Sequence, residues 1–120
     1  MTQHAQAPAQ VVNGEEIAWT AHPRFADIQM KQMLTSAANP LASVSRVRVP
    51  PGAVIGWHQH ATQTETVYVL AGASTLTLGE SPVPFAAGQI VAIPPTLRHT
   101  LINDGAETVE LLCFFTPPVA

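Results

Sequence analysis

Hydrophobic and polar residues alternate with a period of two along most of the chain after residue 41. Over residues 41–49, Val47 and Val49 fall on one side while Arg46 and Arg48 fall on the other. Because successive side chains of a strand point to opposite faces, this pattern predicts a half-buried β-strand. Further segments are predicted as strands from alternation, as at 74–78, or from apolar, β-branched and aromatic runs between turn residues: 54–60, 64–70, 74–78, 83–85, 89–93, 99–103 and 108–115. The pattern predicts an all-β barrel or sandwich of about nine or ten short strands without a helix.

The 120 residues suit one domain, which the pattern divides into three parts. Residues 1–10 are rich in Ala and Gln and are predicted to form a flexible tail. Residues 11–40 are predicted to supply N-terminal strands, beginning with a short strand over 11–17, and residues 41–118 to form the barrel. His4 and His22 have no partner at a useful spacing, so both are interpreted as surface or loop residues.

The composition narrows the possible partners. Charged residues make up only 11% of the chain and hydrophobic residues 47%, which favours a homo-oligomer, expected to be a homodimer, or a large apolar pocket. The net charge of −3 with five Lys and Arg argues against binding to nucleic acid. No apolar run approaches the ~20 residues that span a bilayer, so we expect no membrane association. The N-terminus lacks the features of a secretory signal and Cys113 has no intrachain partner, which together predict a cytoplasmic protein.

Four side chains point to metal chemistry: His58, His60, Glu65 and His99. His58 and His60 are two residues apart and therefore share one face of a strand. Glu65 begins the next strand, where a hairpin would return it to the histidine pair, and His99 must arrive from another strand through tertiary packing. Three imidazoles and one carboxylate suit one divalent transition metal ion, Fe, Mn, Ni, Co, Cu or Zn. Since the metal needs neutral imidazoles, occupancy is expected to fall below about pH 6.5.

The same alternation predicts the walls of a substrate pocket around this site. The apolar residues expected to face inward are Val54, Val67, Val69 and Leu101. They favour a small, partly apolar organic substrate over a sugar phosphate. Gln63 is expected to share the face of Glu65, where it either orients a ligand or is a plain turn residue.

Arg46 and Arg48 allow two interpretations. They belong either to a solvated outer face or to an anion-binding pair at the pocket mouth, for a substrate carboxylate. Cys113 lies between Leu112 and Phe114 and is interpreted as a small apolar core residue rather than a nucleophile.

Two motifs carry a resemblance to a known family. The first has the form G-x5-H-x-H-x4-E-x6-G, and its fixed positions are Gly52, His58, His60, Glu65 and Gly72. The second has the form G-x5-P-x4-H-x3-N, and its fixed positions are Gly88, Pro94, His99 and Asn103. The chain resembles a cupin over residues 41–116. One position departs from the family pattern, because Thr96 stands where glycine is usual, and a β-branched residue disfavours positive φ. We therefore expect this loop to take a different turn.

The resemblance implies a double-stranded β-helix, or jelly roll, with the three histidines and Glu65 as metal ligands. It also implies a homodimer, sometimes formed by exchange of N-terminal strands. With four protein ligands, an ion that accepts six keeps two positions for a small-molecule substrate and dioxygen or water, so no catalytic side chain is assigned and dioxygenase-like chemistry is the first hypothesis. Metal-dependent isomerisation or decarboxylation, a non-catalytic binding or sensing module, and a structural zinc site stay open.

Overall fold

The computed structural model describes residues 8–120, which form ten β-strands and one short 3-10 turn. The predictions for His4 and for most of the tail therefore lie outside the described residues. The elements are η1 Gly14–Glu16, β1 Thr20–Ala21, β2 Gln29–Leu34, β3 Ser43–Val49, β4 Val54–His58, β5 Thr64–Ala71, β6 Ala73–Leu78, β7 Ser81–Ala86, β8 Ile90–Ile93, β9 His99–Ile102 and β10 Val109–Thr116. Within this described part no helix is long and apolar enough to cross a membrane.

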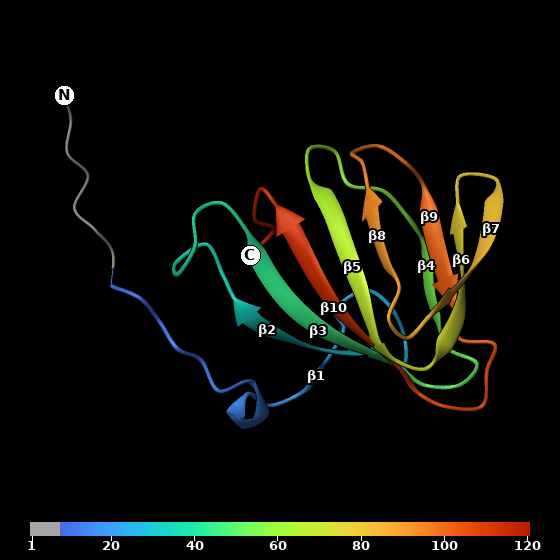
Figure 1. The fold of residues 1–120 in the computed structure, drawn as a ribbon, viewed down its shortest axis with the longest axis horizontal. Helices are drawn as coiled ribbons and strands as arrows, with labels where there is room; N and C mark the ends of the chain where they lie inside the picture. Colours follow the sequence, from blue (N-terminus) through green and yellow to red (C-terminus); the bar gives the residue numbers. More distant parts are fainter. Residues whose placement is uncertain (1–7) are drawn as a thin grey trace.

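The strands form two antiparallel sheets that face each other (Figure 1). The larger sheet has the order β1-β2-β3-β10-β5-β8, and the smaller has the order β4-β9-β6-β7. Strands distant in sequence are neighbours, since β10 pairs with both β3 and β5. This arrangement confirms the predicted all-β jelly roll.

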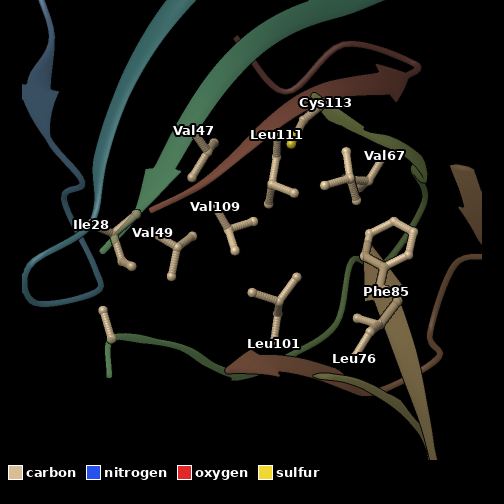
Figure 2. Close-up of a cluster of buried hydrophobic side chains, with 12 residues drawn as sticks. Ile28, Val47, Val49, Val67, Leu76, Phe85, Leu101, Val109, Leu111 and Cys113 are labelled. Atoms are coloured by element: carbon tan, nitrogen blue, oxygen red, sulfur yellow. The ribbon is translucent and has the colours of Figure 1, made fainter. Parts of the chain in front are cut away.

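The core lies between the sheets, where side chains from both point toward one another (Figure 2). Alternation along β3 and β10 buries Val47 and Val49 with Val109 and Leu111, and the sequence pattern places Val47 and Val49 on one face. Leu101 meets them from the smaller sheet. Each such aliphatic side chain contributes about 1.5–3 kcal/mol through burial.

One end of the interior is filled. Val49, Val69, Val109 and Asn103 are each 0% exposed there. The Asn103 side chain donates to the carbonyl oxygens of Val49 (2.8 Å) and Glu107 (2.7 Å), so it joins the ends of the two sheets. The opposite end is therefore the one that can hold a ligand.

The N-terminal segment differs from the prediction. Residues 14–16 form a 3-10 turn rather than a strand, because the Asn13 side chain accepts a hydrogen bond from the Glu15 backbone N–H (3.1 Å) and caps the turn. Lys31, which is 2% exposed, donates to the Gly14 carbonyl (2.6 Å) and holds the turn on the sheet. Residues 8–13 lead away from the sheets (Figure 1). β2 pairs with β3 of the same chain, and exchange of strands between two chains stays a prediction.

The expectation for the loop at Thr96 is wrong. Thr96 adopts φ of 71°, the left-handed conformation that a β-branched residue was expected to avoid. Two hydrogen bonds impose it: Thr96 N–H donates to the His60 carbonyl (2.7 Å), and Leu97 N–H donates to the Pro94 carbonyl (3.4 Å). The loop is thus fastened to the backbone of one predicted metal ligand.

Candidate metal centre and its cavity

The structure brings the four predicted ligands together at the open end of the interior. His58 ends β4 and pairs in register with His99, which begins β9. His60 follows two residues beyond His58, and Glu65 points inward from β5. One ligand atom from each of the four lies within 4.8 Å of all the others, so the group could hold a metal ion.

Backbone carbonyls fix the orientation of two of the imidazoles. His58 Nδ1 lies 2.7 Å from the Gly56 carbonyl oxygen, and His99 Nδ1 lies 2.9 Å from that of Leu97. A carbonyl oxygen only accepts, so each Nδ1 carries the proton and donates it. In the neutral rings each Nε2 therefore presents a lone pair, which is the arrangement found in metal-bound histidines.

The lone pairs meet a carboxylate that cannot donate to them. Glu65 Oε1 lies 3.1 Å from His99 Nε2 and 3.5 Å from His60 Nε2. Within residues 8–120, His60 Nε2 is buried without a hydrogen-bond partner. Neutral imidazoles and a carboxylate at these distances need a proton or a cation between them. The donor set, three nitrogens and one oxygen, fits a divalent transition metal ion.

In the metal-free cluster, burial and the close approach of the side chains shift the pKa values of His58, Glu65 and His99. Burial by itself raises the pKa of Glu65, but the close approach of His60, the hydrogen bond with His99 and the charges of both imidazoles outweigh burial and lower the pKa to about 2. Burial lowers the pKa of His58. Burial is the largest influence on His99 and acts to lower its pKa, but the hydrogen bonds to Glu65 and to the Leu97 carbonyl and the charge of Glu65 together outweigh burial, so the pKa is raised. Without metal, Glu65 and His99 thus favour each other's charged forms.

A cavity of about 340 Å³ lies beside the cluster, and the four side chains form part of its wall. This volume is at the lower end of the range of roughly 300–1,000 Å³ for small-molecule sites. Two of the predicted pocket residues, Val67 and Leu101, line it. Most of the remaining wall is apolar, and its other apolar members include Met30, Val47, Ile55, Leu76, Phe85, Val91, Ile93, Leu111 and Phe115.

The prediction for Val54 is wrong, because it is 41% exposed and does not line the cavity. The ladder between β4 and β9 shifts register: Ile55 pairs with Leu101, whereas His58 pairs with His99. Three steps along β4 thus oppose two along β9, which is a β-bulge that reverses the alternation. Ile55 faces the cavity instead.

Two further pocket predictions are corrected. Val69 points inward and is fully buried, but it lies in the filled end of the interior and does not line the cavity. Gln63 lies between the bend at residues 61–62 and the start of β5, where the pleat of the strand does not fix side-chain direction, and it is also absent from the wall.

Arg46 and Arg48 belong to the outer face of β3 and do not line the cavity, so the interpretation as a pair at its mouth is wrong. Arg46 and Arg48 both pair with Glu110 on the adjacent strand β10. Arg48 also stacks over the Trp19 ring at 3.9 Å. Their alternation with the inward-facing Val47 is the reason for this placement.

Sequence reasoning missed several residues of the wall. His22, Arg24 and Phe25 line the cavity from the loop between β1 and β2, although His22 was interpreted as a mere loop residue. No periodicity exists in a loop, so nothing in the pattern could have placed them. Ser45 also lines the cavity, and it could have been found because it shares the face of Val47.

The predicted role of Cys113 agrees with its surroundings. It is 3% exposed, and its thiol lies in the wall beneath the apolar residues. Burial, with a smaller contribution from the charge of Glu65, raises the pKa of the Cys113 thiol well above its ordinary value. The protonated thiol is a packing group rather than a nucleophile.

A family comparison agrees with the fold. The family model described as the cupin domain matches residues 45–115. The chain is a cupin. The match contains every predicted ligand of this cupin and the strands that carry them, β4, β5 and β9.

Relatives of this cupin carry different names. An uncharacterized protein of Methanocaldococcus jannaschii is 32% identical over 76 residues, which span 63% of this chain and 61% of that protein. An oxalate-binding protein of Thermotoga maritima is 27% identical over 88 residues, which span 72% of this chain and 73% of that protein. The crystal structure of a predicted oxalate decarboxylase from Thermotoga maritima matches with a TM-score of 0.82 and 24% identity, covering 90% of this chain and 99% of that one.

Proposed function

We propose that this cupin is a metal-dependent enzyme with dioxygenase-like chemistry on a small, partly apolar organic substrate. The observation that carries the proposal is the convergence of His58, His60, Glu65 and His99 on the wall of an apolar cavity. The four side chains offer ligand atoms for a metal ion, and they lie beside a cavity of about 340 Å³. This arrangement suits a bound ion that also contacts a small molecule.

In this proposal, the residues of the site have separate roles. Backbone carbonyls hold the rings of His58 and His99, and Glu65 lowers the net charge of the site by one. The apolar wall excludes water around the substrate and strengthens electrostatic interactions within the site. A divalent transition metal ion bound there would supply Lewis acidity and, for iron or manganese, a route for electrons.

The test starts with metal analysis of protein purified without chelator or added metal. The iron form is then screened for oxygen consumption with diketones, phenols and thiols. We expect uptake with at least one class, and its loss in His58→Ala. Zinc closed tetrahedrally by the four side chains, with no oxygen uptake in any metal form, contradicts the proposal.

A binding module is the second candidate, and one relative favours it. The Thermotoga maritima protein is named for binding oxalate, and it aligns with 72% of this chain. In this case the metal form would bind a small organic ligand without consuming it. Mass spectrometry of the ligand after prolonged incubation separates this function from dioxygenation, and it also detects decarboxylation or isomerisation.

We propose in addition that the protein is a cytoplasmic homodimer. Leu70 (40% exposed) and Ile90 (64% exposed) support a covered surface, since both are large apolar side chains of the larger sheet. The free, buried Cys113 is compatible with a reducing compartment. Light scattering tests the dimer, truncation before residue 20 tests strand exchange, and cell fractionation tests the location.

A further inference from the structure

The cavity has a second polar region apart from the histidine–glutamate cluster. It is formed by residues 22–25, which are part of the connection between β1 and β2. These residues line the cavity together with strand residues from both sheets. The connection is held in shape by the hydrogen bond from His22 N–H to the Ile28 carbonyl (2.8 Å). Two of its side chains, His22 and Arg24, can bind an anion.

His22 presents a hydrogen-bond donor with a fixed tautomer. Its Nδ1 accepts from the backbone N–H of Arg24 (3.0 Å) and of Phe25 (3.3 Å). The proton of the neutral ring therefore resides on Nε2. Burial and the charge of Arg24 lower the pKa of His22, which keeps the ring neutral. Across residues 8–120, no hydrogen bond engages this Nε2–H, so it is available to a ligand in the cavity.

Arg24 presents a guanidinium without a counter-ion. Its Cζ lies 5.3 Å from the centroid of the Phe25 ring, which supports the side chain from one side. In the described part of the chain no carboxylate lies within 4.0 Å of it, whereas Arg46 and Arg48 both pair with Glu110. A guanidinium binds a carboxylate through two parallel hydrogen bonds.

Phe25 connects this region to the metal centre. Its ring lies 4.9 Å from the ring of His22 and 5.4 Å from the ring of His58, measured between centroids. The Phe25 ring also packs against Gly56, where a Cβ would lie 3.4 Å from the ring, in van der Waals contact. A single small ligand can therefore reach both the four metal-binding side chains and the pair His22 and Arg24.

We propose that His22 and Arg24 recognise the carboxylate of an organic anion whose other, oxygen-bearing end lies at the histidine–glutamate cluster. The apolar wall, with Val47, Leu111 and Phe115, contacts the body of the ligand between these two ends. This assignment rests on the proposed function, because it takes the cluster as the metal-binding end. The sequence pattern allows an anion-binding pair at Arg46 and Arg48, which lie on the outer strand face. The proposal instead assigns carboxylate recognition to the loop before β2.

The test uses three catechol acids as probes: 3,4-dihydroxybenzoate, 3,4-dihydroxyphenylacetate and 3-(3,4-dihydroxyphenyl)propanoate, each with its amide. The catechol is constant at the metal end, while the carboxylate lies at three successive distances. Binding to the zinc-loaded protein is measured by calorimetry without oxygen, and zinc content is measured separately for every variant. We expect at least one acid to bind about 10-fold more tightly than its amide, as a charge-assisted bidentate contact provides.

Matched variants assign that preference to named residues. Arg24→Gln is expected to reduce the ratio of acid to amide affinity to within about 2-fold, while the affinity for the amide and the zinc content are unchanged. Arg98→Gln is the control, because Arg98 also stacks on an aromatic ring (Trp57, 4.9 Å) but does not line the cavity. His22→Asn keeps an acceptor for the two backbone N–H groups and removes the Nε2 donor, so it should lower the ratio with little change in melting temperature.

The outcomes are distinguishable. If zinc binds but no acid is preferred over its amide, or if Arg24→Gln keeps the preference, the assignment is overturned and the metal centre is unaffected. If the wild-type protein binds no divalent transition metal, the proposed function fails, and the two-ended recognition fails with it.

Discussion

Two clusters of polar side chains occupy opposite sides of the larger sheet, and they are built in opposite ways. The outer cluster contains Arg46, Arg48, Glu110 and Trp19, and the inner cluster contains His58, His60, Glu65 and His99. In the outer cluster each oxygen of Glu110 faces its own guanidinium. In the inner cluster three imidazoles and one carboxylate converge, and among residues 8–120 no Lys or Arg side chain pairs with Glu65.

The difference separates a cluster whose charges are satisfied within the protein from one that could hold a metal ion. Opposite charges satisfy each other in the outer cluster, and its one unpaired group, Arg46 Nε, is a donor that keeps its proton. The inner cluster leaves His60 Nε2 buried and unpaired, which costs free energy unless a cation or proton is present. Burial of unsatisfied electron-pair donors is therefore the better indicator of a ligand site than the presence of charge.

The largest expected effect concerns metal affinity. His99→Ala removes one of four donors and should weaken binding of a divalent transition metal by more than about 100-fold. Glu110→Gln, in the outer cluster, should leave it unchanged. Calorimetric titration of the metal-free proteins measures both. Equal effects of the two substitutions would contradict the distinction between the clusters.

The stability of the metal-free protein should depend on pH through the inner cluster. Glu65 has a lowered pKa of about 2, so its contribution is present above about pH 4.5 and is lost as the pH falls toward 2. His99 has a raised pKa, so its contribution is complete below about pH 6.5 and is lost as the pH rises through the raised value. The acid loss amounts to about 3 kcal/mol.

Chemical denaturation from pH 2 to 9 measures this dependence. Glu65→Gln should flatten both limbs, because Glu65 is the partner of His99. Zinc should raise the melting temperature more at pH 8 than at pH 5.5, since protons compete for the same imidazoles. A metal-free protein whose stability does not change between pH 6 and 9 would show that Glu65 and His99 share no proton.

The outer cluster should matter for folding alone. Glu110→Ala leaves two guanidinium groups without their shared carboxylate and should cost about 1 kcal/mol of unfolding free energy. The control is Glu15→Ala, because Glu15 also pairs with Arg46 (3.1 Å) but its side chain is 82% exposed. Its cost should be near zero in urea unfolding. A loss of metal affinity in Glu110→Ala would link the two faces of the sheet.

The smallest effect tests the backbone that carries the inner cluster. Thr96→Gly removes the cost of φ 71° and should raise the unfolding free energy by up to about 1 kcal/mol, with metal affinity unchanged. Asp27→Gly is the matched control at φ 66° and should gain less, because Asp tolerates the left-handed region better than Thr. A destabilised Thr96→Gly would mean that the threonine side chain itself supports the loop.

Local patterning predicted a large part of the molecule. The alternation along β3 placed Val47 and Val49 together on one face, which the fold buries, because the period of a strand is a property of the chain itself. The spacing of His58, His60, Glu65 and His99 identified side chains that the fold does bring within 4.8 Å of one another. A metal ion in that cluster stays a prediction.

The tertiary structure decided what the period could not. Because of the bulge in β4, Ile55 lines the cavity in place of the predicted Val54. The register depends on the partner strand β9 and not on β4 alone. Val69 packs in the filled end and does not line the cavity. Alternation predicts which face of a strand a residue occupies, but it does not predict how far along the barrel that residue lies. His22 and Arg24 lie in a loop whose position depends on contacts with distant residues, such as the approach of Phe25 to Gly56. The sequence by itself thus determined most of the strands and the four candidate ligands, while long-range packing determined which side chains line the cavity.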